Sequence, residues 1–223
     1  MLFLMLTHLV SMAGGLKPLN LSVFSVTSVA ELRFLGLRIH VGLMLMHVVQ
    51  WDLEPSEWVQ RWASLIPEGG LVLDLACGGG RHARYLAALG YSVVAVDRDE
   101  LALASLHSVA RVKAMAVDLE AGAWPLAGRQ FGGIVVTNYL HRPLFPNLLA
   151  ALGSSGVLIY ETFGVGNERF GKPSNPAFLL RDGELLDAVQ GHLRVVAYEA
   201  LQCTAPRPAV IQRICATRTE SSP

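Results

Sequence analysis

The stretch LVLDLACGGGRHA, residues 71–83, decides the fold of this chain. It begins as an apolar run that contains one acid, Asp74, breaks at three consecutive glycines, residues 78–80, and continues as a helical pattern from Arg81. We therefore predict a buried strand, a tight turn and a helix. Glycine permits a positive φ angle and lets a ligand approach the backbone closely. The start of the helix adds unpaired N–H groups and the positive end of the helix dipole.

Apolar runs and helical patterns alternate along the rest of the chain. The predicted strands are residues 71–76, 92–96, 112–117, 131–137 and 156–160, and the predicted helices are residues 54–65, 81–89, 99–109, 144–152 and 182–190. Such alternation predicts an α/β fold with a parallel sheet that is covered by helices on both faces. Two last apolar runs, residues 193–201 and 209–217, indicate a closing pair of antiparallel strands.

The composition narrows the class of protein. Of the 223 residues, 52% are hydrophobic and 16% are charged, and the formal net charge is zero. This balance supports one large apolar core and lacks the basic excess of a non-specific nucleic-acid binder, so we expect no nucleic-acid partner. The three cysteines, Cys77, Cys203 and Cys215, form no C-x-x-C pair, and the histidines show no metal-binding spacing. We expect reduced thiols in a cytoplasmic protein and no metal site.

Residues 1–45 differ from the rest of the chain. They hold a single acid, Glu31, and only three formal cations, and five of the six methionines fall within residues 1–46. The first thirteen residues resemble a signal peptide but lack Lys and Arg, and their apolar run is too short to cross a membrane. We predict a poorly structured extension over residues 1–45, no stable membrane insertion, and one domain over residues 46–223. A membrane-associating segment is the alternative for the extension.

Polar side chains lie near the carboxyl ends of the predicted strands. The first strand contains Asp74, and the later four are followed in turn by Asp97, Asp118, Asn138 and Glu161. In an open α/β sheet, ligands bind beyond these ends, near the point where the strand order reverses. Each Asp alone also suits a helix N-cap or a turn. Three acids near successive strand ends, beside a glycine turn, indicate a nucleotide site, in which an acid after the second strand can accept both hydroxyls of a ribose.

Two nucleotide cofactors fit the glycine turn when it is considered alone. Residues 78–83, GGGRHA, satisfy the dinucleotide pattern G-x-G-x-x-A, and Asp97 follows at nearly the distance of a ribose-binding acid. A nicotinamide dinucleotide site is therefore possible.

A longer set of motifs resembles class I S-adenosylmethionine-dependent methyltransferases. Residues 74–80, DLACGGG, fit their first motif, D/E-x-G/A-x-G-x-G, and residues 93–97, 117–119 and 137–140 lie where the next three motifs occur. The resemblance covers residues 50–223 and extends to the small-molecule branch that includes tellurite-resistance methyltransferases. It implies a Rossmann-like, doubly wound, mostly parallel seven-stranded sheet with a C-terminal antiparallel strand pair. It also implies S-adenosyl-L-methionine as cofactor and a small-molecule methyl acceptor.

The resemblance implies a role for each residue of the glycine turn. Ala76, Gly78 and Gly80 would pass under the methionine part of the cofactor. Asp74 would hold the turn or contact the amino-acid end of the cofactor through water.

The resemblance also assigns the residues after the second, third and fourth strands. Asp97 would bind the ribose hydroxyls, and Arg98 would flank the adenine. Asp118 would accept a hydrogen bond from the adenine amino group, with the backbone of Leu119 beside it. Asn138, together with the tyrosine that follows it, would border the methionine part and the mouth of the substrate site.

Methyl transfer asks little of the protein's side chains, because the sulfonium already carries an activated methyl group. A general base is needed only if the acceptor must lose a proton. His141 is the first candidate for that base, followed by Glu161 and Tyr139. Residues 138–141, NYLH, lack the two prolines found in enzymes that methylate nucleobases or glutamine, which argues against DNA methylation. Residues 164–176 form a loop long enough to be a substrate lid.

We therefore predict a methyltransferase that moves the methyl group in line to a small-molecule acceptor. Two alternatives stay open at this point. One is a catalytically silent S-adenosylmethionine-binding protein. The other is a nicotinamide-dependent reductase, in which Asp118 and the turn after the fifth strand have no assigned role.

Overall fold

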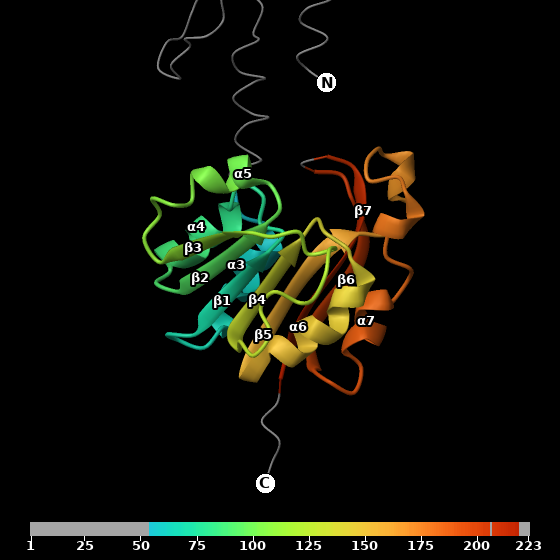
Figure 1. The fold of residues 1–223 in the computed structure, drawn as a ribbon. Helices are drawn as coiled ribbons and strands as arrows, with labels where there is room; N and C mark the ends of the chain where they lie inside the picture. The colour runs from blue at the N-terminus through green and yellow to red at the C-terminus, as the bar shows by residue number, and fades with distance from the viewer. Residues whose placement is uncertain (1–53, 206, 219–223) are drawn as a thin grey trace, which may run out of the picture. The chain divides into compact units, whose positions relative to one another are not determined.

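The computed structural model describes residues 54–205 and 207–218, and the predicted extension over residues 1–45 lies outside them (Figure 1). The strands of the described part are β1 (Leu71–Leu75), β2 (Ser92–Asp97), β3 (Val112–Ala116), β4 (Phe131–Thr137), β5 (Leu152–Phe163), β6 (Arg194–Cys203) and β7 (Ala209–Thr217). The α-helices are α3 (Glu57–Trp62), α4 (Arg81–Ala88), α5 (Glu100–Ala104), α6 (Phe145–Ala151) and α7 (Glu184–Val189). Short 3₁₀ helices are η1 (Ala63–Leu65), η2 (Arg142–Leu144), η3 (Asn167–Arg169) and η4 (Pro176–Phe178). Within this part, no helix has the length and apolar character needed to cross a membrane.

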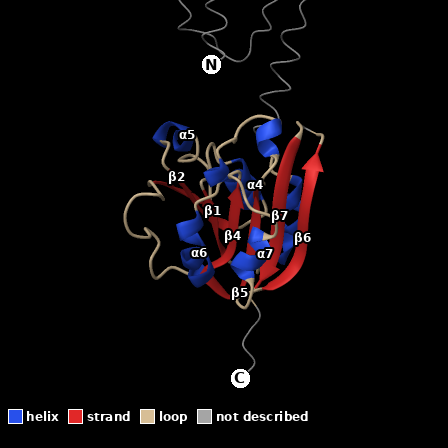
Figure 2. Cartoon of the chain, turned by 90° about the vertical axis from the view of Figure 1, so that its right-hand side faces the viewer, coloured by secondary structure: helices blue, strands red, loops and turns tan. Residues whose placement is uncertain are grey.

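The seven strands form one sheet in the order β3-β2-β1-β4-β5-β7-β6. β7 runs antiparallel to both β5 and β6, whereas β1 to β5 pair in parallel. Figure 2 shows the antiparallel β6–β7 pair from its own side of the domain. The predicted doubly wound, mostly parallel sheet with a C-terminal antiparallel pair is confirmed. Because the strand order reverses between β1 and β4, the carboxyl ends of these two strands mark the switch point.

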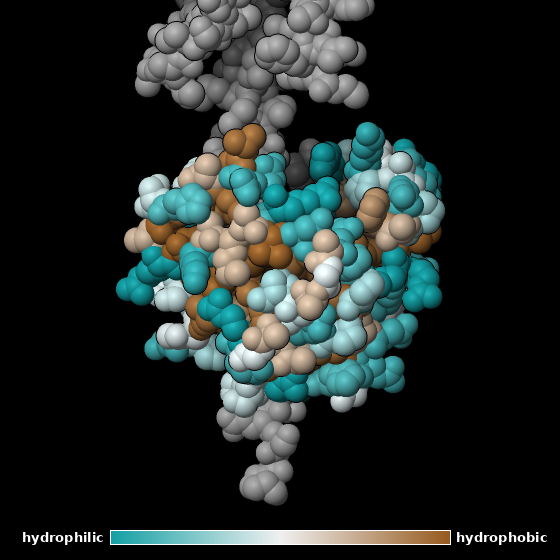
Figure 3. Space-filling view, viewed as in Figure 1, coloured by the Kyte–Doolittle hydropathy of each residue, from teal (hydrophilic) through white to brown (hydrophobic). Residues whose placement is uncertain are grey.

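Helices cover both faces of the sheet because successive strand residues point to opposite sides. On one face, Leu73 and its equivalents in the neighbouring strands share a buried cluster with Leu148 of α6 and Leu185 of α7. On the other face, Val72 shares a cluster with Leu86 of α4 and residues of α3 and α5. Hydrophobic residues that stay exposed are interspersed with hydrophilic ones on the face shown in Figure 3.

Two elements differ in length from their predictions. The helix predicted over residues 99–109 ends at Ala104, and the residues after it form turns that include serines, which favour turns over helix interiors. The strand predicted over residues 156–160 extends from Leu152 to Phe163. Its end is held in register by β7, where Glu161 pairs with Arg213, and this pairing is invisible in the local sequence.

The turn between β1 and α4 depends on Gly80. This residue is the N-cap of α4 and has a φ of 75°, in the left-handed region that favours glycine. A Cβ added to it would lie 2.4 Å from the side chain of Leu106, which is fully buried. The glycine therefore permits both the turn and the close packing of the core beneath it.

We predict that Gly80→Ala lowers the free energy of unfolding by about 2–4 kcal/mol. The alanine would have to adopt a left-handed backbone conformation, and its Cβ would crowd the side chain of Leu106. Gly79→Ala is the matched control. A Cβ at Gly79 meets no atom within 4 Å, so we expect a change within about 0.5 kcal/mol. Urea unfolding of both variants measures the difference, and equal stabilities would contradict the packing role of Gly80.

Candidate cofactor and active site

The glycine turn is a sharp loop in which left-handed residues alternate with others. Ala76 has a φ of 53°, Gly78 of 54° and Gly80 of 75°. A Cβ on Gly78 would meet no atom within 4 Å, so the backbone there faces open space that a ligand can occupy. Ala76 is not a glycine, and its left-handed conformation costs about 1–2 kcal/mol. The surrounding structure therefore holds this turn in a shape that the residues do not adopt freely.

Asp74 supports the turn from beneath. Its side chain is buried, with 1% exposed, and it accepts a hydrogen bond from the backbone N–H of Ala83 in the first turn of α4. Its Oδ2 atom has no hydrogen-bond partner among the described residues. Burial raises the pKa of this carboxyl from 3.8 to about 7, although Arg81 opposes the shift. Of the two roles that the sequence left open, holding the turn is the one that this contact supports.

Asp97 joins the end of β2 to the same turn. Its Oδ2 accepts a hydrogen bond of 2.7 Å from the N–H of Gly78, and its Oδ1 accepts one of 3.0 Å from the N–H of Asp99. Each carboxylate oxygen keeps a further lone pair. The carboxylate therefore fixes the turn and can still accept hydrogen bonds from a ligand.

A cavity of about 370 Å³ lies beyond the carboxyl ends of β1 to β5. This volume lies within the range of small-molecule sites. Seven of the residues assigned from the sequence line it together: Ala76, Asp97, Arg98, Asp118, Leu119, Asn138 and Tyr139. The structure thus brings the predicted cofactor residues of four strand ends to one place at the switch point of the sheet.

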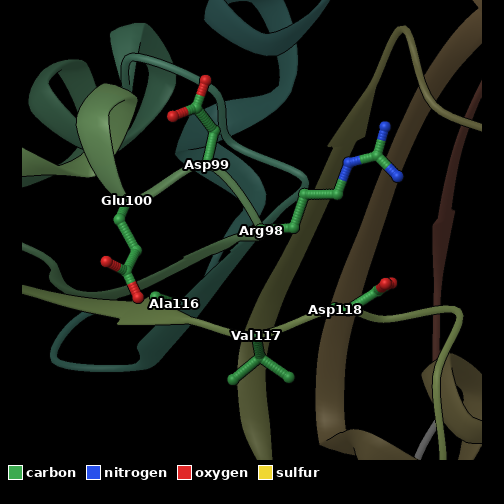
Figure 4. A pocket seen from close by; sticks show the side chains of 6 residues that line it. All are labelled: Arg98, Asp99, Glu100, Ala116, Val117 and Asp118. Carbon is green, nitrogen blue, oxygen red and sulfur yellow. The ribbon is translucent and has the colours of Figure 1, made fainter.

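A shallower hollow of about 640 Å³ continues this cavity over the ends of β2 and β3. The two share Arg98, Val117 and Asp118. Figure 4 shows that Arg98 and Asp118 extend to the same side, whereas Asp99 and Glu100 point away from them. Asp99 instead caps α5 by accepting hydrogen bonds from the first backbone N–H groups of that helix. Arg98 and Asp118 are therefore the charged groups that face the shared space.

Tyr139 lines the cavity beside Glu120. Its hydroxyl donates a hydrogen bond of 3.4 Å to Glu120, and its carbonyl oxygen accepts one of 2.8 Å from the Tyr160 hydroxyl. Desolvation raises the pKa of Tyr139, and the carboxylates of Glu120 and Asp118 raise it further. The phenol is therefore protonated at neutral pH and serves as a hydrogen-bond donor there, not as a base.

The other two predicted catalytic residues lie elsewhere. The Glu161 carboxylate accepts a hydrogen bond of 2.7 Å from the Ser56 hydroxyl and forms an ion pair of 3.2 Å with Arg213. His141 begins η2 without a side-chain capping bond, and neither residue lines the cavity. These contacts make Glu161 a structural group that ties the start of α3 to the sheet.

Seven lining residues were given no site role by the sequence reasoning: Val117, Glu120, Leu140, Thr162, Phe163, Pro173 and Phe178. Pro173 belongs to the loop over residues 164–176, which was predicted as a lid, but no sequence pattern singled out Pro173 itself. Phe163 is the last residue of β5, two positions after Glu161, and an aromatic residue so near a strand-end acid was a detectable signal. Most of these residues are apolar, and Phe163, Pro173 and Phe178, from the end of β5 and the segment after it, give the cavity an apolar wall.

His82 links the glycine turn to the segment before α3. Its Nε2 accepts a hydrogen bond of 3.1 Å from the N–H of Ser56, and its Nδ1 lies 3.4 Å from the Thr137 hydroxyl. The ring is 1% exposed, and burial lowers its pKa from 6.5 to about 3, with a further contribution from Arg81. His82 is therefore a neutral structural residue, as a position in the first turn of α4 suggests.

Comparisons with known proteins bear on this site. Residues 72–154 match the family model of a methyltransferase domain. No curated protein matches the sequence. The match favours the S-adenosylmethionine-dependent methyltransferases over the nicotinamide-dependent reductases, and it covers β1 to the start of β5, the strands that bear the predicted motifs.

Solved structures share the fold. TehB from Haemophilus influenzae is 19% identical, with a TM-score of 0.61 over 73% of this chain, and this chain spans 62% of TehB. A TehB-like S-adenosylmethionine-dependent methyltransferase from Corynebacterium glutamicum is 18% identical, with a TM-score of 0.57. The match covers 80% of this chain and 96% of the Corynebacterium protein. An S-adenosylmethionine-dependent methyltransferase from Mesorhizobium loti is 18% identical, with a TM-score of 0.56. The match covers 71% of this chain and 96% of the Mesorhizobium protein.

Asp74 and His82 are expected to give opposite pH dependences of stability. Between pH 3.8 and about 7, folded Asp74 keeps a proton that the unfolded chain has lost, so stability falls as the pH rises. Between about 3 and 6.5, unfolded His82 holds a proton that the folded ring has lost, so stability rises with pH. Each contribution is at most about 5 kcal/mol.

We therefore predict that Asp74→Asn makes stability rise more steeply with pH than in the wild type, and that His82→Gln makes it fall. Urea unfolding from about pH 4 to about pH 7 gives both slopes. Parallel curves for the wild type and both variants would show that neither group titrates as its burial requires.

Proposed function

We propose that this chain, which carries an S-adenosylmethionine-dependent methyltransferase domain, transfers the cofactor's methyl group to a small-molecule acceptor in the cavity at the ends of β1 to β5. One observation carries the proposal: Asp97 and Asp118, from neighbouring strand ends, line the same cavity as Ala76 of the glycine turn. The free cysteines Cys77, Cys203 and Cys215 support a cytoplasmic location.

The residues present fit S-adenosylmethionine better than a dinucleotide. The N–H of Gly78 is already bound by the Asp97 carboxylate, so the turn does not offer this donor to a phosphate. The same carboxylate would repel a pyrophosphate group. A sulfonium cofactor carries no phosphate. Its hydroxyl and amino groups donate hydrogen bonds, which carboxylates can accept.

When bound, the cofactor supplies an activated methyl group on a positively charged sulfur. Asp97 would accept hydrogen bonds from the ribose hydroxyls, and Asp118 from the adenine amino group. Asn138 and Tyr139 would border the methionine part. Asn138 has a φ of 55°, a left-handed conformation that its short polar side chain tolerates. In this arrangement the methyl group would lie toward the apolar residues Phe163 and Phe178.

The protein's contribution to rate would come from alignment and from exclusion of water. Phe163 and Phe178 line the cavity from the end of β5 and from η4, whereas Asp97 and Asp118 lie at the ends of β2 and β3. Holding an acceptor in line with the methyl group can lower the barrier by roughly 7–11 kcal/mol. No histidine or lysine lines the cavity among the described residues, and the Tyr139 phenol is protonated, so the site favours an acceptor that needs no strong protein base.

We predict that Asp97→Ala weakens binding of S-adenosylhomocysteine by more than about tenfold, since the variant loses a ligand acceptor and the anchor of the turn. Glu68→Ala is the control, because Glu68 lies in the turn before β1, at the opposite end of that strand from the cavity. Titration calorimetry measures both affinities. Unchanged affinity in Asp97→Ala would remove this residue from the site, and no binding to the wild type would contradict the proposed function.

The acceptor class is tested with methyl-labelled S-adenosylmethionine in a lysate. We expect the label in the small-molecule fraction when the full chain is added, and none above background with Asp97→Ala. Label that appears only in protein or nucleic acid would contradict a small-molecule acceptor.

A further inference from the structure

The charges that line the cavity are mostly negative. Asp97, Asp118 and Glu120 contribute three carboxylates, and Arg98 contributes the single guanidinium among the described lining residues. The bound cofactor, with a sulfonium, an ammonium and a carboxylate, adds one net positive charge. The site therefore keeps a net negative charge when loaded, and an anionic acceptor would enter against it.

The rest of the lining is apolar and comes from the carboxyl end of β5 and the segment after it. Phe163 is 8% exposed and packs with Leu179 and Ala209 in a small cluster of its own. Phe178 of η4 is 46% exposed and completes the wall with Pro173. This wall suits the flat, apolar body of an aromatic ring, because edge-on and offset ring contacts add to the burial of apolar area.

Glu120 connects the charged and apolar parts. It lines the cavity and accepts the hydrogen bond of the Tyr139 hydroxyl, which places its carboxylate at their boundary. Desolvation is the main cause of the raised pKa of Tyr139, and the nearby carboxylates of Glu120 and Asp118 raise it further. Positive charge at this boundary is stabilised, and negative charge is opposed.

Resting on the proposed function, we propose that the acceptor is an aromatic heterocycle whose neutral ring nitrogen takes the methyl group, and that the site rejects oxyanions and carboxylates. The nitrogen lone pair forms the new N–C bond while the S–C bond breaks and its electron pair stays on sulfur. The positive charge passes from sulfur to the heterocycle, and no proton leaves. The product cation lies beside Glu120, whereas an alcohol or thiol would need a stronger base than the carboxylates of the described lining.

The test compares ligands of similar size and opposite charge on the full chain saturated with S-adenosylhomocysteine. N-methylisoquinolinium represents the product cation, 2-naphthoate represents an anionic acceptor, and tellurite represents an oxyanion. By calorimetry, we expect the cation to bind about tenfold or more tightly than either anion. The advantage should shrink as salt is added, since exposed charges are screened. Isoquinoline should also be methylated in the presence of S-adenosylmethionine.

Two variants separate the two parts of the proposal. Glu120→Gln should weaken binding of the cation by about three- to tenfold without weakening 2-naphthoate, because it removes one negative charge at the boundary. Glu68→Gln is the matched control, since Glu68 lies in the turn before β1, at the opposite end of that strand. Phe178→Ala, at a half-exposed position, should weaken both aromatic ligands by a similar factor.

The outcomes distinguish this inference from the proposed function. Failure to bind S-adenosylhomocysteine contradicts the proposed function. If that product binds but 2-naphthoate or tellurite binds as tightly as the cation, or if the cation does not bind, the acceptor class is wrong while the cofactor assignment holds. Equal effects of Glu120→Gln and Glu68→Gln on the cation would also overturn the role of Glu120.

Discussion

The hydrogen bond from the Gly78 N–H to the Asp97 carboxylate is the contact on which the site depends. It joins the turn after β1 to the end of β2 across 2.7 Å, and Ala76 of that turn and Asp97 both line the cavity. It also uses the amide that a phosphate-binding loop would present to its ligand. The same acid that marks a nucleotide site thus makes this turn unsuited to a pyrophosphate and suited to a cofactor that carries positive charge.

Two buried titratable groups support this turn, although burial is unfavourable for their charged forms. Asp74 reaches the first turn of α4 from β1, and His82 reaches back to Ser56 before α3. Burial disfavours the charged form of each group, so Asp74 keeps its proton until the pH approaches about 7 and His82 is neutral above about pH 3. The turn, with its left-handed Ala76, is kept in shape by these contacts more than by its own conformational preference.

The cavity has two chemically distinct halves because two parts of the chain build it. Asp97 and Asp118 stand at the ends of β2 and β3 and supply charge, whereas Phe163 and Phe178 come from β5 and the segment after it. Glu120 and Tyr139 meet between them. In such a site, the negative charge selects against anionic acceptors, and the aromatic wall selects for acceptors with an apolar ring. The choice of acceptor then depends on charge and shape and not on a catalytic base.

The sequence by itself determined the strand–turn–helix unit and the cofactor side of the site. Those features are local, and the carboxyl ends of parallel strands necessarily meet at one edge of a sheet. Only the tertiary structure decided the role of Glu161, which is held by Ser56, 105 residues away, and by Arg213, 52 residues away. It likewise brought Pro173 and Phe178 to the cavity. Side-chain partners set by packing between distant segments leave no periodicity or spacing in the sequence that reveals them.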